Sequence, residues 1–331
     1  MKNLSVKMFL IAFICMIGNL SNAQTVGLVL DSYVIDRWYK DQKLFVDRVK
    51  ELGGKVKVEV AKGDPAEQLK KCKALIADGV KVLVVVAVDG KKAIEIAKIA
   101  KAAKVPLISY DRFILSPDVT LYISYHSEQV GELQAKYVQS KMPKGNYILV
   151  SGPISDNNSV LIKKGQLKTL RTAINSKDIK ILEDLNMDDW GEKGATTKMN
   201  SFFATSKEKP SVIIAANDAL ASGVIKALPA NLLGKVLVTG QDADLIAIQH
   251  IIDGTQTMTI YKPIKPLAYL AAESAMDLAK GQPIKGKTKW IYGNISVDAI
   301  LLNPIVVDKS NYKTTVVKDG HIAQSDLVEK K

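Results

Sequence analysis

Cysteine is almost absent from this sequence: its 331 residues include only Cys15 and Cys72. Cys15 lies in an N-terminal segment that we expect to be cleaved off, which leaves Cys72 without a disulfide partner in the remaining chain. The position of Cys72 in a helical pattern predicts a buried thiol. Aromatic residues are also scarce, at 6% of the chain, so we expect a core of Val, Ile, Leu and Ala side chains.

The sequence motifs that usually carry catalysis are missing. There is no Gly-x-Ser-x-Gly around a nucleophile, no Gly-rich phosphate-binding loop and no Gly-x-Gly-x-x-Gly after the first predicted strand. The histidines His126, His250 and His321 are far apart, and no spacing of Cys, His and carboxylate residues fits a zinc site. We therefore predict that the chain is not an enzyme and that it uses neither a cofactor nor a metal ion.

Basic residues outnumber acidic residues, 46 to 34, which gives a formal net charge of +12. The lysines are spread over nearly every predicted helix instead of forming one block, as on a solvated basic surface. Binding to nucleic acid would require a basic face with a reading element, and no helix-turn-helix segment precedes the first predicted strand. We therefore predict no nucleic-acid partner.

Residues 1–23 are typical of a signal peptide. Lys2 and Lys7 form its positive start, and residues 8–20 form an apolar stretch that is too short to span a bilayer. Ser21-Asn22-Ala23 then offers a cleavage site. Because an exported chain without a disulfide framework suits the bacterial periplasm, we predict a periplasmic protein that begins at residue 24.

Strand-like segments alternate with helix-like segments along most of the chain, which is typical of βαβ units and parallel sheets. The expected strands are residues 25–30, 55–60, 82–88, 105–109, 147–150, 180–185, 212–215, 236–239 and 257–261. The expected helices are residues 37–52, 65–77, 91–103, 127–141, 158–175, 192–206, 218–228, 244–253 and 267–280. Two similar series in tandem predict an α/β fold with two lobes of the same architecture. Pro263 and Pro266 mark a place where the chain could cross back to the first lobe, and short crossings would permit a hinge motion.

Polar side chains follow many of the predicted strands. Because ligands of open α/β sheets bind outside the carboxyl ends of the strands, we expect these side chains to converge. They are Asp31, Asp89, Asp111, Arg112, Asp156, Asn158, Asn217, Asp242 and Lys262. An Asp or Asn in such a place is equally typical of a helix N-cap. Arg112 and Lys262 are not caps, however, and Asp218 can cap the helix that follows Asn217.

This set of side chains predicts a site for a neutral polyhydroxyl ligand, and for a sugar in particular. Carboxylates accept hydrogen bonds from hydroxyl groups, whereas amides offer both a donor and an acceptor. Trp38 and Trp190 stand close to predicted strand ends, where an indole could pack on the C–H face of a sugar ring. Ordinary core packing is the alternative role for each tryptophan.

Both halves of the chain contain short distinctive motifs. They are Asp36-Arg37-Trp38-Tyr39-Lys40-Asp41, Tyr110-Asp111-Arg112, Val130-Gly131-Glu132-Leu133-Gln134-Ala135, Asp156-Asn157-Asn158, Gly240-Gln241-Asp242-Ala243-Asp244-Leu245 and Gly254-Thr255-Gln256-Thr257-Met258-Thr259-Ile260-Tyr261-Lys262-Pro263. In their identity and order these motifs resemble those of the periplasmic sugar-binding proteins of ABC importers. The resemblance runs from about Val26 to the C-terminus.

The resemblance implies two Rossmann-like lobes with parallel sheets, joined by a three-crossing hinge, which is the periplasmic binding protein type I fold. The implied N-terminal lobe contains residues 24–125 plus 263–300, and the C-terminal lobe contains residues 126–262 plus 301–331. The implied ligand contacts are Arg37, Trp38, Asp111, Arg112, Asp156, Asn158, Trp190, Asn217, Asp242 and Lys262. The two tryptophans would sandwich the sugar ring, Lys262 would reach in from the hinge, and Asp111 would orient Arg112 or touch the ligand at its margin. Asp89 has no counterpart in this set.

The resemblance further implies a monomer that captures a monosaccharide, D-xylose, and delivers it to the membrane permease of an ABC importer. Two positions depart from the family pattern, Ser32 in the first loop and Asp189 before Trp190, so ribose, arabinose, galactose or another sugar stays open as the ligand. A receptor for chemotaxis or signalling is an alternative function. The export signal argues against the sensing half of a transcription regulator. A sugar-processing enzyme is a further alternative, in which Asp156 and Asp242 would form the pair of catalytic carboxylates.

Overall fold

The structure is a computed structural model that describes residues 23–33 and 37–328. The predicted signal peptide therefore lies outside the described residues except for Ala23, and Cys15 lies outside them with it. Residues 34–36, which include Asp36 of the first motif, are also outside the described part. No helix within the described ranges is long and apolar enough to cross a membrane.

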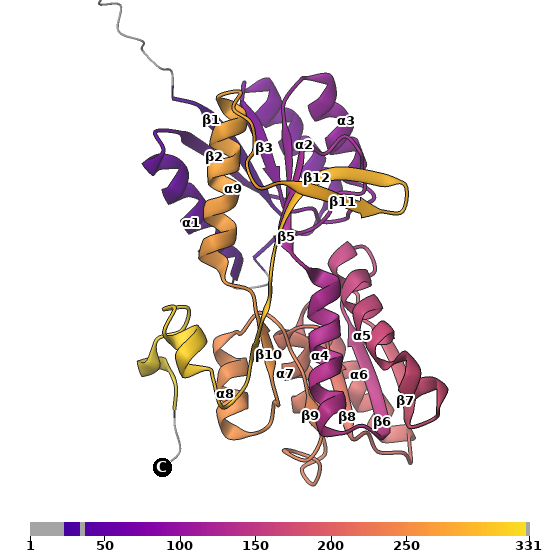
Figure 1. Cartoon of the computed structure of the whole chain (residues 1–331). Coiled ribbons are helices and arrows are strands. Elements are labelled where there is room, and N and C mark those ends of the chain that lie inside the picture. Colours follow the sequence, from indigo (N-terminus) through magenta and orange to yellow (C-terminus); the bar gives the residue numbers. More distant parts are fainter. Residues whose placement is uncertain (1–22, 34–36, 329–331) are drawn as a thin grey trace, which may run out of the picture.

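A seven-stranded sheet forms the centre of the first lobe, in the order β11-β12-β5-β4-β3-β1-β2. Its strands are β1 (Thr25–Leu30), β2 (Lys55–Val60), β3 (Val82–Val85), β4 (Leu107–Tyr110), β5 (Leu121–Tyr125), β11 (Thr288–Tyr292) and β12 (Ile295–Leu302). All pair in parallel except β11, which runs antiparallel to β12. Helices α1 (Arg37–Glu51) and α9 (Ile264–Ala279) pack side by side on one face, and α2 (Pro65–Ala77) and α3 (Ile94–Ala102) cover the other (Figure 1).

The second lobe has the same layered plan around a parallel four-stranded sheet, β7-β6-β8-β9. Its strands are β6 (Gly145–Ser151), β7 (Ile179–Asn186), β8 (Val212–Ala215) and β9 (Leu237–Val238). Its helices are α4 (Ser127–Lys141), α5 (Asn157–Asn175), α6 (Glu192–Thr205), α7 (Asp218–Ala227) and α8 (Leu245–Asp253). β10 (Thr259–Tyr261) extends this layer through a bridge between Thr239 and Met258 and pairs antiparallel with β13 (Ile305–Val307).

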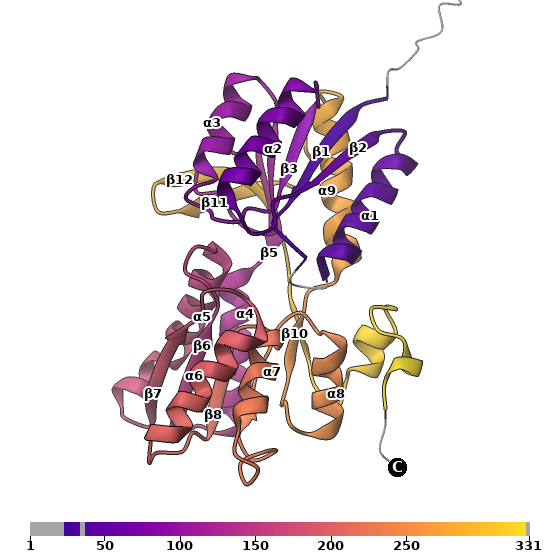
Figure 2. The ribbon, with the colours of Figure 1, turned by 180° about the vertical axis from the view of Figure 1, so that it is seen from behind.

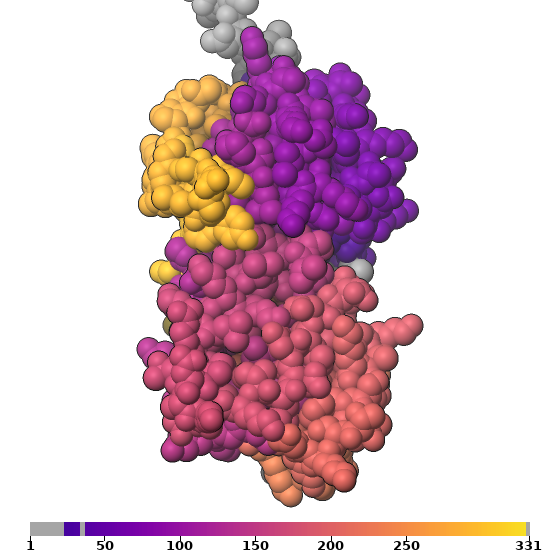
Figure 3. Space-filling model, turned by 90° about the vertical axis from the view of Figure 1, so that its right-hand side faces the viewer, coloured from indigo at the N-terminus to yellow at the C-terminus, as the bar shows by residue number. Residues whose placement is uncertain are grey.

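Within the described residues the chain passes between the lobes three times: after β5, after β10 and after β12. These three segments lie together at the waist of the molecule (Figures 1 and 2). The lobes are also in contact along the side shown in Figure 3. The fold is therefore the two-lobe α/β architecture with mostly parallel sheets that the sequence predicted.

Several elements differ from the sequence-based expectations. The strand β5 and the hairpin β11–β12 were not predicted, because short segments with mixed polarity give little periodic signal. α9 begins at Ile264, three residues before the predicted start, and includes Pro266. A proline fits there because the first-turn N–H groups of a helix have no intrahelical partner. Cys72 is fully buried, as predicted.

Candidate functional site

A small buried cavity lies between the lobes, outside the carboxyl ends of strands from both sheets. Only about 20 Å³ of it is open to a water-sized molecule, because lining side chains contact one another across it: Arg112 with Asp156 and Arg37 with Asp242. The residues that line it are Arg37, Trp38, Asp111, Arg112, Asp156, Asn158, Trp190, Gln241, Asp242 and Lys262. Nine of the ten residues predicted from the sequence are therefore brought together, and Asn217 is the exception.

Charged side chains of both signs line the cavity in equal number. The cationic side chains are Arg37, Arg112 and Lys262, and the carboxylates are Asp111, Asp156 and Asp242. Each of them is buried, with at most 8% of its surface exposed to solvent. A buried, charge-balanced lining suits a neutral ligand with many hydrogen-bonding groups better than an ion.

Asp156 is the centre of one half of the lining. Its Oδ2 atom lies 2.9 Å from Arg112 Nε and accepts a hydrogen bond of 3.0 Å from Trp190 Nε1. Its Oδ1 atom accepts from the backbone N–H of Asn158, so Asp156 also caps α5. Burial raises the pKa of Asp156 above its usual value, and the positive charge of Arg112 opposes this rise.

Arg37 is the centre of the other half. Its Nη2 atom lies 3.3 Å from Asp111 Oδ2, and its Nη1 atom lies 3.5 Å from Asp242 Oδ1. Lys262 Nζ lies 3.1 Å from the same oxygen of Asp242. Burial alone would raise the pKa of Asp111, but the charges of Arg37 and Lys262 lower it overall.

Two of the carboxylates stand on strained backbone. The φ angles are 60° at Asp111 and 100° at Asp242, in the left-handed region that favours glycine. The backbone of Asp111 is fixed by hydrogen bonds: its N–H donates to Ile123 O at 2.7 Å, and its carbonyl accepts from Ser124 Oγ at 2.7 Å. Strained residues persist where the surroundings over-determine them, and they cluster at functional sites.

The two tryptophans belong to opposite lobes. Trp38 lies at the start of α1, with the Arg37 guanidinium 4.6 Å and the Arg112 guanidinium 5.7 Å from its ring centre. Its Nε1–H group is buried and has no hydrogen-bond partner among the described residues. Trp190 follows β7 and packs against Gly152, where an added Cβ atom would lie 2.7 Å from the indole ring.

Some of the strand-end residues are helix caps, and the structure selects a different cap for α7 from the one that the sequence predicted. Asn217, not Asp218, caps α7: its Oδ1 atom accepts from Leu220 N at 2.9 Å. Its amide group donates to the carbonyl of Trp190 at 3.3 Å, so Asn217 lies beside that tryptophan. Asp218 is fully buried and binds Gln256 and Thr259 instead. Asp89 accepts from the N–H groups of Lys91 and Lys92, the usual contacts of a cap.

Two residues near the cavity were not predicted. Asp41 holds Arg37 through contacts of 3.2 and 3.3 Å and accepts a hydrogen bond from Tyr110. Its spacing of four residues from Arg37 on a helix was the available signal. Gln241 lines the cavity and stands inside a motif that the sequence singled out. Among the residues that the structure describes, no group of three or more His, Cys, Asp or Glu side chains is placed to hold a metal ion.

Comparison with known proteins gives one family. Residues 26–283 match the model of the periplasmic binding protein domain. The D-xylose-binding periplasmic protein of Escherichia coli (strain K12) is 41% identical over 303 residues, which cover 91% of this chain and 92% of that protein. The protein of the same name from Haemophilus influenzae is 41% identical over 296 residues and 89% of each chain.

A solved structure has the same fold. The carbohydrate transporter solute binding protein from Chloroflexus aurantiacus, in complex with D-glucose, matches with a TM-score of 0.85 and 28% identity over 92% of this chain and 99% of that one. Together with the family match and the 41% identity to the two relatives, this likeness shows that the chain belongs to the periplasmic binding protein family.

Proposed function

We propose that the cavity between the lobes binds one molecule of D-xylose and that the protein delivers this sugar, chemically unchanged, to the membrane permease of an ABC importer. The two relatives at 41% identity are named for D-xylose. The observation that supports sugar binding most strongly is the lining itself: balanced buried charges that both lobes bring to one small cavity. The chain is periplasmic, like those relatives, and a signal peptide at residues 1–23 fits this location.

In this proposal each charged pair holds sugar hydroxyl groups. A hydroxyl between Arg112 and Asp156 accepts from the guanidinium and donates to the carboxylate, and Arg37 and Asp242 form a second pair of the same kind. Charge-assisted hydrogen bonds contribute about 1.5–3 kcal/mol each. Asp111, Asn158 and Lys262 offer further donors and acceptors.

The indoles of Trp38 and Trp190 supply the apolar contacts, one from each lobe. The unpartnered Nε1–H of Trp38 supports a ligand oxygen nearby, because buried donors usually have an acceptor. Asn217 uses one amide hydrogen on Trp190 O, and we assign its second amide hydrogen to the ligand.

The lobe limits are part of the same proposal: residues 24–125 plus 263–300 move against residues 126–262 plus 301–331 about the three crossings, and we move the last limit to Leu302, where β12 ends. Because residues of both lobes line the cavity, opening of the hinge separates the two halves of the lining and releases the sugar. The protein acts as a monomer and performs no chemical step.

Isothermal titration of the mature chain with D-xylose, ribose, arabinose, glucose and galactose tests the proposal. We expect D-xylose to bind with a dissociation constant of about 1 μM or below, with recovery of the intact sugar by chromatography. Tighter binding of another sugar would contradict the assignment to xylose. Binding of none of them, or the release of a product, would contradict the proposed function.

A further inference from the structure

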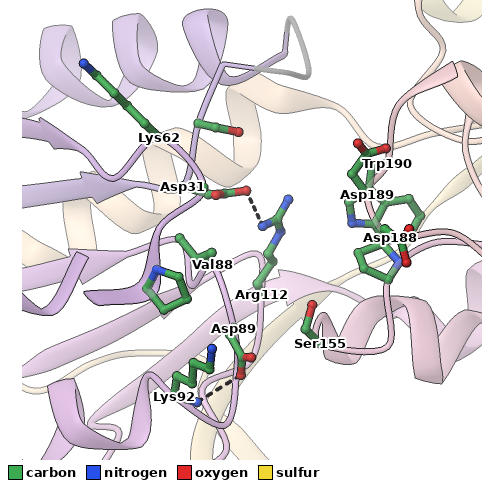
Figure 4. A pocket seen from close by; sticks show the side chains of 14 residues that line it. Asp31, Lys62, Val88, Asp89, Lys92, Arg112, Ser155, Asp188, Asp189 and Trp190 are labelled. Atoms are coloured by element: carbon green, nitrogen blue, oxygen red, sulfur yellow. Dashed lines mark hydrogen bonds and ion pairs between the residues drawn. The ribbon is translucent and has the colours of Figure 1, made fainter. Parts of the chain in front are cut away.

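A second and larger chamber lies beside the sugar cavity, and we infer that it holds the second ring of a pentose disaccharide whose first ring occupies the cavity. This inference rests on the proposed function of the cavity. About 370 Å³ of the outer chamber is open to a water-sized molecule. Asp31, Lys62 and Val88 of the first lobe line one side, and Ser155, Asp189 and Trp190 of the second lobe line the other (Figure 4).

The outer chamber and the cavity meet at two side chains. Arg112 and Trp190 line both spaces. Both also contact Asp156 Oδ2, at 2.9 and 3.0 Å, so this group of three stands between the two spaces. A sugar hydroxyl inserted between Arg112 and Asp156 would move these two side chains apart. The glycosidic bond of a disaccharide would have to pass from the cavity to the outer chamber at this place.

Asp31 indicates what the outer chamber binds. Its Oδ2 atom lies 2.6 Å from Arg112 Nη1, a contact drawn in Figure 4. Its Oδ1 atom is also buried but has no hydrogen-bond partner among the described residues. Asp31 is 8% exposed and lines the outer chamber, whereas it is not one of the residues around the cavity. An unpaired buried carboxylate oxygen is unfavourable, so a hydroxyl group in the outer chamber is its natural donor.

The rest of the lining suits the same occupant. Four carboxylates (Asp31, Asp89, Asp188 and Asp189) and three cationic side chains (Lys62, Lys92 and Arg112) line it, which favours a group whose hydroxyls donate to carboxylates and disfavours an anion. The Trp190 indole, present in both spaces, offers an apolar surface for a second ring. Ser32 and Asp189, the positions that depart from the family pattern, both line the outer chamber.

Titration of the mature chain with D-xylose and with β-1,4-xylobiose tests this inference. Ser155 is an exposed residue of the outer chamber, and its backbone carbonyl accepts from Gly90 N, so a side-chain change keeps that contact. We expect xylobiose to bind the unaltered protein within about tenfold of xylose. Ser155→Trp, which places an indole in the outer chamber, is expected to weaken xylobiose binding by about tenfold or more and to leave xylose binding within about twofold. Ser155→Ala is the matched control and should leave both affinities unchanged.

The two sugars separate failure of this inference from failure of the proposed function. If the unaltered protein binds xylose but binds xylobiose more than about tenfold more weakly, the inference is overturned and the proposed function stays intact. Equal effects of Ser155→Trp on both sugars would also overturn it, since the tryptophan would then act on the cavity. The absence of xylose binding to the unaltered protein would contradict the proposed function itself.

Discussion

Arg112 of the first lobe and Asp156 of the second lobe are in direct contact, with 2.9 Å between Nε and Oδ2. Other side-chain contacts join the lobes at the same boundary: Asn158 Nδ2 donates to Asp111 Oδ1 at 3.1 Å, and Arg37 Nη1 lies 3.5 Å from Asp242 Oδ1. The side chains proposed to bind the sugar therefore also hold the lobes together. Sugar binding would exchange such contacts for bonds through the ligand.

The first prediction concerns Arg112. Arg112→Ala leaves Asp31 and Asp156 buried without their cationic partner. Removing one member of a buried, hydrogen-bonded charge pair costs about 2–5 kcal/mol of binding free energy. We expect D-xylose affinity, measured by isothermal titration, to fall by an amount in this range.

Arg48→Ala is the matched control for this experiment. Arg48 also pairs with a carboxylate, Glu273, at 2.6 Å, but its side chain is 28% exposed and lies on the α1–α9 surface. We expect no change in sugar affinity, because exposed pairs contribute little and this one is remote from the cavity. Unchanged affinity in Arg112→Ala would remove Arg112 from the site.

The second prediction separates the two roles of Asn217. Asn217→Ala removes both the cap of α7 and the amide donor, so we expect a loss of about 0.5–2 kcal/mol in the free energy of unfolding. We expect a further loss of about 1–3 kcal/mol in the free energy of xylose binding. Urea unfolding and isothermal titration measure the two quantities.

Asn217→Ser keeps a side-chain oxygen for the cap and removes the amide group without burying a charge against Trp190 O. We expect this variant to keep the stability of the unaltered protein and to lose affinity for xylose. If it binds xylose as tightly as the unaltered protein, Asn217 acts only as a cap.

The sequence predicted the convergence of the strand-end side chains better than the fold's smaller elements. Asp111, Asp156 and Asp242 each follow a strand of one of the two sheets. Because parallel topology brings residues that follow strands to one edge of the sheet, their convergence could be predicted without knowledge of the tertiary contacts. The strand β5 and the hairpin β11–β12 depend on pairing with distant segments, β12 with β5 above all. Local pattern carries little information about such pairing.

The sequence also could not predict which of two adjacent polar residues takes a given role. Asn217 and Asp218 are both good capping residues, and the structure selects Asn217 because Asp218 is buried under Gln256 and Thr259. The sequence motif containing Gln241 was visible, but the direction of its side chain depends on the turn that places Asp242 at positive φ. Such choices follow from packing between segments that are far apart in the chain.

The third prediction uses the close approach of Gly152 to Trp190. Gly152→Ala places a Cβ atom 2.7 Å from carbons of the indole ring, which is closer than real contacts allow. The ring has to move, and with it the hydrogen bond from Trp190 Nε1 to Asp156. We expect xylose affinity to fall by about 1–3 kcal/mol in an isothermal titration.

Gly194→Ala is the control for a change from glycine to alanine in the same lobe. Gly194 lies in α6, and its added Cβ atom would meet Met187 Sδ at an ordinary 3.5 Å. We expect unchanged xylose affinity and a gain of about 0.5–1 kcal/mol in the free energy of unfolding, because alanine favours the helix. Normal binding by Gly152→Ala would show that Trp190 can shift without consequence for the ligand.

The last prediction concerns pH and His321, in the C-terminal segment. Its Nε2 atom lies 3.0 Å from Ala243 O, and its ring packs against Tyr261 with 4.9 Å between ring centres. Burial, aided by the charge of Lys40, lowers the pKa of His321 from 6.5 to about 4. The unfolded chain therefore binds a proton at His321 between these pH values while the folded chain does not, so the free energy of unfolding falls as the pH falls through this window.

Between pH 7 and pH 5 we expect His321 to account for a loss of about 2 kcal/mol in the free energy of unfolding, measured by urea unfolding. The matched variant His321→Gln keeps an N–H donor but has no titrating group, so we expect its free energy of unfolding to fall by correspondingly less over the same pH range. Because His126 and His250 are present in both proteins, equal pH dependence of the two would show that His321 is not held neutral by the fold.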